Sequence, residues 1–220
     1  MLVRHFMSTA VLSLTEKQTC RQAMEFMREN SIRRAPVLRE GALVGMVSER
    51  DLLRVLPGTV MQKGTDAGAD AERLPVSRVM TTKVITLDPE EHLEDASRRM
   101  LTHKIGGLPV VHRGAVVGIL TESDIFRALA RVLESRGVMR VSFARTPRAD
   151  LPPDPVRMAL ELGLDVRGFV THDRPGGESL SVLRVSGSQG DALVEALGAA
   201  GFAVLEYVDS RGDASHSHAA

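Results

Sequence analysis

The stretch Gly45–Asp51, with the sequence GMVSERD, recurs 73 residues later as Gly118–Asp124, with the sequence GILTESD. The match extends toward the N-terminus without gaps, because Met7–Thr9 (MST) falls on Met80–Thr82 (MTT) at the same spacing. About a third of the aligned positions are identical, and most of the others exchange similar residue types. Two copies indicate a tandem, pseudo-symmetric pair, since a solenoid needs three or more repeats.

Each copy has the hydrophobic pattern of a β-α-β-β-α unit. The first copy predicts strands at Val11–Leu14, Ala35–Leu38 and Leu43–Ser48, a helix after the first strand, and a second helix from Glu49. The second copy predicts strands at Val84–Leu87, Leu108–Val111 and Val116–Thr121, with its second helix from Glu122. A unit of about 50 residues buries little apolar surface alone, so we expect the copies to pack on each other with pseudo-two-fold symmetry.

Capping residues indicate where the first helix of each copy begins. In the first copy, Thr15 and Gln18 have the spacing of a capping box. In the second copy, Asp88 suits the N-cap, Pro89 the first helical position and Glu91 the third. We therefore predict that these helices begin next to Thr15 and Asp88.

The pattern changes after Gly137 and predicts a third unit. Strands are expected at Val138–Ala144, Val166–Thr171, Ser179–Val185 and Phe202–Val208, and helices at Pro155–Leu162 and Asp191–Ala200. The order β-α-β-β-α-β is that of a small ferredoxin-like domain. The fold class is thus α/β (α+β), with two β-α-β-β-α repeats and a C-terminal βαββαβ domain.

These patterns define the expected domain organisation. The boundaries are 1–58 for the first repeat, 59–75 for a linker, 76–136 for the second repeat, 138–209 for the C-terminal domain and 210–220 for a tail. The linker is rich in Gly, Ala and Asp and predicts a loop. The tail is small and polar and is expected to be disordered.

Composition excludes several classes of protein. Lys plus Arg and Asp plus Glu both number 28, which argues against a general nucleic-acid binder. The single cysteine excludes an internal disulfide framework and a multi-cysteine zinc site, and we expect no metal site. No apolar run approaches the roughly 20 residues of a membrane helix, and residues 1–6 have no signal-peptide character. We expect a cytoplasmic protein without a membrane or nucleic-acid partner.

The duplicated Pro-Val and Gly-h-h-Ser/Thr-x-x-Asp motifs, where h is apolar, resemble a tandem CBS-domain pair (a Bateman module) over residues 1–136. The C-terminal part resembles an ACT-like domain, a combination similar to small bacterial CBS–ACT proteins of the acetoin-utilisation AcuB type. The resemblance implies a ligand-sensing regulatory homodimer rather than an enzyme, with no obligatory cofactor. Its usual effectors are AMP, ADP, ATP, S-adenosylmethionine, sometimes NAD or a cyclic dinucleotide.

The motifs Ser48-x-x-Asp51 and Thr121-x-x-Asp124 have two explanations. On spacing alone, each is a capping box at a helix start. The same helix end also favours an anion, and a carboxylate there can accept two ribose hydroxyls. The duplication and the resemblance favour nucleotide contact, with Asp51 and Asp124 on ribose and with Ser48 and Thr121 near ribose or phosphate.

The resemblance also implies a slot for the base and cations for phosphate. The slots would form from Thr9–Val11 (Thr9, Val11) with Pro36, and from Thr82–Val84 (Thr82, Val84) with Pro109; alternatively these residues only begin and fill a sheet. Arg33 and Arg34 precede Pro36 and are candidate phosphate ligands, or else solvated surface residues. The second copy has Gly106 and Gly107 at the matched positions, with His103 and Lys104 as possible substitutes.

Other functions stay open as alternatives. The chain could be a structural module that dimerises, or binds a partner protein, without any ligand. A hydrolase using Asp51 or Asp124 is disfavoured, because no paired base or metal cluster accompanies them. Residues 145–154 lack the glycine turn at which ACT-like domains take amino acids, so we expect this domain to relay or dimerise. Either it or a separate regulated protein would read the occupancy of the ligand site.

Overall fold

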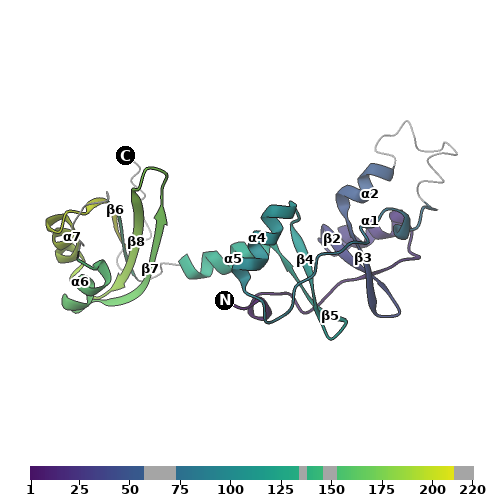
Figure 1. Cartoon of the computed structure of the whole chain (residues 1–220), viewed down its shortest axis with the longest axis horizontal. Helices are drawn as coiled ribbons and strands as arrows, with labels where there is room; N and C mark the ends of the chain where they lie inside the picture. The colour runs from purple at the N-terminus through teal and green to yellow at the C-terminus, as the bar shows by residue number, and fades with distance from the viewer. Residues whose placement is uncertain (57–72, 134–137, 146–152, 211–220) are drawn as a thin grey trace. The chain divides into compact units, whose positions relative to one another are not determined.

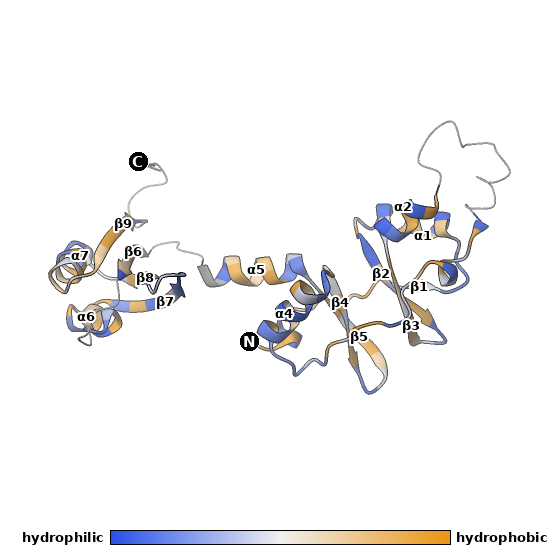
Figure 2. Cartoon of the chain, turned by 45° about the horizontal axis from the view of Figure 1, so that its top comes forward, coloured by the Kyte–Doolittle hydropathy of each residue, from blue (hydrophilic) through white to orange (hydrophobic). Residues whose placement is uncertain are grey.

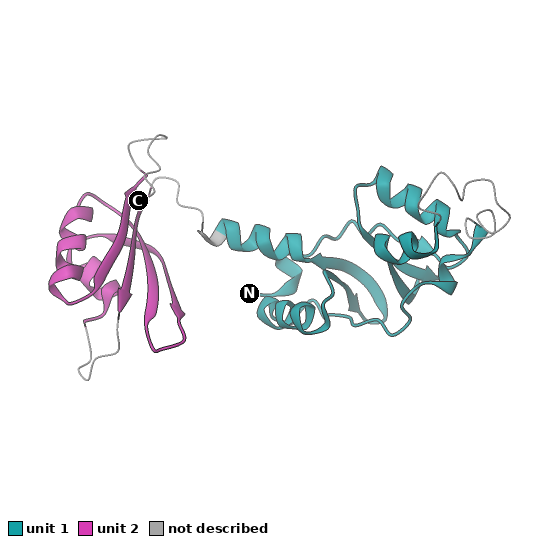
Figure 3. Cartoon of the chain, turned by 90° about the horizontal axis from the view of Figure 1, so that it is seen from above, with its two compact units in different colours: residues 1–132 teal, residues 133–220 magenta. Residues whose placement is uncertain are grey.

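The computed structural model describes residues 1–56, 73–133, 138–145 and 153–210. It divides into two compact units, Met1–Val132 and Leu133–Ala220 (Figure 3). The expected linker and tail, and the proline-rich stretch after residue 145, lie almost entirely outside the described residues. The predicted domain boundaries at 58, 75 and 136 therefore stay predictions.

The first unit contains both copies of the repeat. The first copy consists of η1 (Val3–His5), β1 (Leu14–Thr15), α1 (Cys20–Glu29), β2 (Arg34–Arg39), β3 (Ala42–Ser48) and α2 (Glu49–Val55). The second copy consists of η3 (Val76–Arg78), α4 (Leu93–His103), β4 (Gly107–His112), β5 (Ala115–Thr121) and α5 (Glu122–Leu133). The four long strands and both second helices lie where the repeat pattern predicts them (Figure 1).

One five-stranded sheet connects the two copies, in the order β1-β2-β3-β5-β4. The strands β3 and β5 pair antiparallel at Ala42 and Ala115, which are equivalent positions in the repeat. The pseudo-two-fold relation expected from the sequence therefore runs between these two central strands. Each copy keeps a hydrophobic cluster of its own around its first helix and its hairpin.

The predicted first strands are wrong in extent. The strand β1 has only two residues, and at the matched place in the second copy only an isolated bridge joins Leu87 to Val110. The residues just before these points pair with strands of the other copy: Ser8 pairs with Ile119, and Thr81 pairs with Met46. The segment that precedes the first helix of each copy thus pairs with the other copy. Few of its residues can therefore form a strand within their own copy.

The predicted helix starts are also wrong by four residues. The N-cap of α1 is Thr19, which forms a capping box with Gln22. The N-cap of α4 is His92, without a side-chain cap, while Asp88 accepts a bond from the Glu90 amide and closes a turn. The cause is long-range: the Leu93 amide donates to the Met1 carbonyl, 2.8 Å away, so the N-terminus covers the start of α4.

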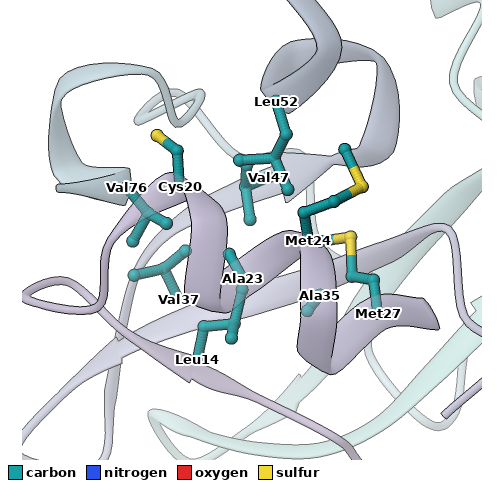
Figure 4. Packing of buried hydrophobic residues seen from close by; sticks show 10 residues of the cluster. All are labelled: Leu14, Cys20, Ala23, Met24, Met27, Ala35, Val37, Val47, Leu52 and Val76. Carbon is teal, nitrogen blue, oxygen red and sulfur yellow. The ribbon is translucent and has the colours of Figure 1, made fainter. Parts of the chain in front are cut away.

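The segment at the start of each copy contributes to the hydrophobic core of the opposite copy. Val3 is fully buried in the cluster of the second copy, with Phe6 and Met7 packed beside it. Reciprocally, Val76 is fully buried in the cluster of the first copy, where it lies beside Cys20 (Figure 4). We call residues 1–8 and 74–81 the exchanged segments.

The second unit is a four-stranded antiparallel sheet with two helices. Its elements are β6 (Met139–Arg145), α6 (Pro155–Glu161), β7 (Asp165–Asp173), β8 (Ser179–Ser186), α7 (Gly190–Ala199) and β9 (Ala203–Asp209). The strand order is β7-β8-β6-β9, and both helices lie on one face of the sheet (Figure 1). The predicted β-α-β-β-α-β order is confirmed, and the ACT-like assignment stays a prediction.

Candidate functional site

A cleft of about 780 Å³ lies inside the first unit, between the two copies. The first copy contributes the segment before and at the start of β2, and the turn from β3 into α2. The second copy contributes Thr81 at the end of its exchanged segment, residues 83–85, residues 104–109 across the start of β4, and Glu122 at the start of α5. The lining of the cleft includes Arg33, Arg34, Ser48, Asp51, Lys83, Val84, Lys104, Gly106, Gly107, Pro109 and Glu122.

Asp51 lies at the N-terminus of α2 and has one carboxylate oxygen free of short contacts in the cleft. Its Oδ2 accepts bonds from the Ser48 amide at 3.0 Å and from the Ser48 hydroxyl at 2.6 Å. Its Oδ1 is 3.8 Å from the Arg54 guanidinium, which is within ion-pair distance but beyond hydrogen-bond distance. The capping box therefore orients the carboxylate and leaves Oδ1 able to accept hydroxyl groups.

Asp124 at the start of α5 has a different environment. Its Oδ2 accepts bonds from the Thr121 amide at 2.8 Å and from the Thr121 hydroxyl at 2.6 Å, as in the first copy. Its Oδ1, however, forms a short ion pair with Arg127, and the residue is only 7% exposed. The two motifs cap their helices in the same way. They differ in whether the second carboxylate oxygen, Oδ1, can accept a bond from a ligand.

The guanidinium of Arg34 occupies the space above Gly106 and Gly107 of the other copy. A Cβ at Gly106 would lie 2.5 Å from both Arg34 Nη2 and Glu122 Oε2, and a Cβ at Gly107 would lie 2.8 Å from Arg34 Cδ. Neither glycine has a positive φ, so space rather than backbone conformation requires them. The absence of side chains at these positions makes room for a cation from the first copy.

Burial changes the electrostatics of Arg34. Desolvation lowers the pKa of its guanidinium below the usual value, and the nearby Glu122 carboxylate partly offsets this effect. Glu122 also lines the cleft, so a cation and a carboxylate from different copies both face the ligand space. A partly desolvated guanidinium with incomplete charge compensation binds a further anion favourably.

The cleft brings together part of the residues predicted from the sequence. Those that line it are Arg33, Arg34, Ser48, Asp51, Val84, Lys104 and Pro109; those that do not are Thr9, Val11, Pro36, Thr82, His103, Thr121 and Asp124. Val84 and Pro109 of the second copy lie here with Asp51 of the first. The sequence predicts the two slots and the two motifs without matching one to the other, and the structure places the slot of the second copy beside the motif of the first.

Five charged lining residues were not predicted as site residues: Glu49, Arg50, Arg54, Lys83 and Glu122. Glu49 and Glu122 follow Ser48 and Thr121 in the two motifs, where the sequence predicts them only as the first residues of helices. The others carry no local pattern, and only the tertiary structure places them in the cleft. Within the described ranges, no cluster of three His, Cys, Asp or Glu residues could hold a metal, and no helix is long and apolar enough to cross a membrane.

The CBS domain family matches this chain twice, at residues 3–58 and 76–131. The two matches together cover about half of the chain and correspond to the two copies described above. The chain therefore belongs to the CBS domain family, as a tandem pair followed by a further α+β unit.

Individual relatives agree with this membership. The CBS domain-containing protein YhcV of Bacillus subtilis is 33% identical over 123 residues, which are 56% of this chain and 81% of YhcV. A Vibrio cholerae protein described as an acetoin utilization protein (AcuB) has a crystal structure with a TM-score of 0.52 and 31% identity, over 60% of this chain and 93% of that one.

The CBS domain pair of protein MJ0100 has been solved in complex with 5′-methylthioadenosine and S-adenosyl-L-methionine. It matches with a TM-score of 0.51 and 24% identity, over 60% of this chain and 97% of that one. At this level of identity the similarity supports a shared fold and no more.

Proposed function

We propose that this protein is a regulatory sensor that binds an adenine nucleotide, or another adenosyl ligand, in the cleft between its CBS copies. CBS-domain proteins are in general regulatory modules. The adenosyl class follows from the family resemblance. The volume of about 780 Å³ suits a small-molecule site.

The observation that carries the proposal is the carboxylate of Asp51. It is held rigidly by Ser48 at the end of a helix, it faces the cleft, and its Oδ1 is more than 3.5 Å from Arg54. These are the properties of an acceptor for ribose hydroxyls. Val84 and Pro109 offer apolar surface for a base, while Arg33, Arg34 and Lys104 offer charge for phosphate.

The motif of the second copy has a structural role in this proposal. Arg127 and Thr121 use both carboxylate oxygens of Asp124, and burial removes that residue from solvent. A ligand at Asp124 would have to displace Arg127, whereas a ligand at Asp51 meets only the longer, 3.8 Å ion pair with Arg54. We therefore place the ribose at Asp51.

Titration of adenosyl compounds, followed by thermal unfolding, tests this proposal. A ligand at 100 times its dissociation constant adds about 2.7 kcal/mol to the free energy of unfolding. We expect stabilisation by at least one adenosyl compound, abolished in Asp51→Asn and retained in Asp124→Asn. Binding retained in Asp51→Asn and lost in Asp124→Asn would contradict the placement. No stabilisation by any compound would favour the ligand-free, partner-binding alternative.

A homodimer, and a relay of ligand occupancy to the C-terminal unit or to a partner protein, are further parts of the proposal. Leu53 on α2, which also lines the cleft, is 53% exposed, and its equivalent in the second copy, Phe126 on α5, is 69% exposed. Figure 2 shows hydrophobic and hydrophilic residues alternating along α5. Apolar side chains at equivalent surface positions of both copies suit a symmetric contact with a second copy of the chain. Light scattering of the wild type and of Leu53→Glu/Phe126→Glu would measure the oligomeric state.

A further inference from the structure

Two matched methionines, Met7 and Met80, open the duplicated motifs MST and MTT. Neither side chain lines the cleft, so the proposed ligand site leaves both without a role. Each lies in an exchanged segment and is partly buried. The thioether of Met7 packs on Gly118 of β5, and that of Met80 packs on Gly45 of β3. Each methionine therefore reaches the central strand of the opposite copy.

The contact between each sulfur and its glycine leaves no space for another heavy atom. A Cβ at Gly118 would lie 2.6 Å from Met7 Sδ, and a Cβ at Gly45 would meet the sulfur of Met80 in the same way. Neither glycine has a positive φ, so the close approach of the sulfur, rather than the backbone conformation, requires glycine here. Groups packed at this density transmit any added volume to their neighbours.

The residue after each methionine holds its exchanged segment in place. The backbones of Ser8 and Ile119 exchange two hydrogen bonds, both 2.9 Å long. The backbones of Thr81 and Met46 exchange two more, of 2.8 and 2.9 Å. A displacement of either sulfur would therefore strain the bonds that attach the two copies to each other.

We propose that Met7 and Met80 are a paired oxidation site, at which a hydroperoxide converts the thioethers to sulfoxides and weakens the attachment of the exchanged segments. The sulfur attacks one peroxide oxygen, so that an S–O bond forms and the O–O bond breaks. The sulfur loses two electrons, and the leaving hydroxide takes the proton of the transferred oxygen and becomes water when hydrogen peroxide is the oxidant. Methionine sulfoxide reductases reverse this change.

The physical effect follows from the polarity and the volume of the product. The sulfoxide oxygen is a strong acceptor, and it would replace an apolar contact with glycine. The second consequence is the added atom, for which the contacts at Gly45 and Gly118 have no room on the glycine side. The inference does not depend on what the cleft binds, because both consequences act on the contacts between the copies.

Peptide mass mapping during treatment with hydrogen peroxide tests whether the site is accessible. Met1 is 50% exposed and serves as the unshielded reference, whereas Met24 and Met27 are at most 4% exposed and serve as the shielded one. We expect Met7 and Met80 to gain oxygen more slowly than Met1 and well before Met24 and Met27. Oxidation of Met7 and Met80 only together with Met24 and Met27 would overturn the proposal, because the site would then open only on unfolding.

Thermal unfolding tests the consequence. Peroxide treatment should lower the melting temperature of the wild-type first unit by at least about 5 °C. The variant Met7→Leu/Met80→Leu has side chains of similar volume that peroxide does not oxidise, so its melting temperature should stay unchanged on treatment. This variant keeps Cys20 and every other methionine. A fall as large as in the wild type would assign the effect to those groups and overturn the proposal.

The matched control is Met158→Leu, which removes a partly buried methionine from α6 of the second unit. We expect this variant to lose as much stability in the first unit as the wild type does. Protection by Met158→Leu equal to that of the double variant would contradict the assignment to Met7 and Met80.

The wild-type protein keeps the test informative if the double variant fails to fold. The loss of melting temperature should increase with the fraction of Met7 and Met80 oxidised. Treatment with the two stereospecific methionine sulfoxide reductases should restore it as the sulfoxides at these positions disappear. Complete oxidation of both residues without a change in melting temperature would overturn the proposal.

Discussion

At the scale of single residues, glycines mark the contacts between the copies. A Cβ at Gly45 would lie 2.4 Å from the sulfur of Met80 and 3.2 Å from the Thr81 carbonyl, both in the exchanged segment of the second copy. Gly118 has the same relation to Met7. The methionine end can move, whereas the backbone carbonyl is held by the pairing of Thr81 with Met46.

We predict that Gly45→Ala destabilises the first unit by about 1–3 kcal/mol, because an added methyl group overpacks this contact. The control is Gly198→Ala on α7, where a Cβ meets nothing within 4 Å. That change should stabilise the second unit by about 0.5–1 kcal/mol, since alanine is the better helix former. Chemical denaturation of both variants measures the difference, and a neutral Gly45→Ala would contradict the tight packing.

Cys20 provides a chemical reporter of the first copy. Its side chain is fully buried, and this burial raises the pKa of the thiol above its usual value. The thiolate is the reactive form, so both burial and the raised pKa suppress reaction. We predict that the native protein resists a disulfide reagent at neutral pH, and that the thiol reacts rapidly in denaturant. Rapid labelling of the native protein would contradict the packing in Figure 4.

At the scale of helices, the two first helices differ in how their N-termini are satisfied. α1 has a complete capping box from Thr19 and Gln22, whereas His92 gives α4 no side-chain cap. In both cases a carbonyl of an exchanged segment accepts the first helical amide, from Leu74 for α1 and from Met1 for α4. These helix starts therefore depend on residues far away in the sequence.

Two substitutions should have opposite effects. Thr19→Ala removes the side-chain cap of α1 and is predicted to cost about 1 kcal/mol of unfolding free energy. His92→Ser adds a hydroxyl that can accept from the amides of the first turn of α4, and should gain about 0.5–1 kcal/mol. Urea denaturation of both variants is the measurement. A destabilising His92→Ser would show that the N-terminal segment leaves no room for a capping hydroxyl.

At the scale of the whole molecule, the exchange of segments joins the two copies into one folding unit. Val3 and Val76 are each fully buried in the cluster of the opposite copy. Loss of one copy would therefore remove a part of the core of the other. Cooperative units of this kind open together rather than one copy at a time.

Labelling of Cys20 can test this cooperativity. Val3→Ala creates a cavity in the cluster of the second copy and should cost about 2 kcal/mol. If the copies unfold together, it should also accelerate labelling of Cys20 in the first copy. The control is Leu101→Ala, which changes a side chain that is 77% exposed on α4 of the second copy. Labelling unaffected by Val3→Ala, despite lower stability of the second copy, would mean that the copies fold independently.

The sequence by itself determined the repeat, the four long strands, the second helix of each copy and the element order of the C-terminal unit. These features arise from local patterns, namely alternating apolar residues and the duplicated Ser48 and Thr121 motifs. It also identified seven of the residues that line the cleft, by motif spacing and resemblance rather than by geometry.

Only the tertiary structure decided which copy each exchanged segment joins. Gly45 and Gly118 offer the same space, so a repeat of 73 residues is equally compatible with packing within a copy or across copies. For the same reason, the sequence did not reveal that Arg34 lies against Gly106 or that Asp124 pairs with Arg127. Contacts between residues far apart in the chain depend on shape and charge in three dimensions, and no local periodicity encodes them.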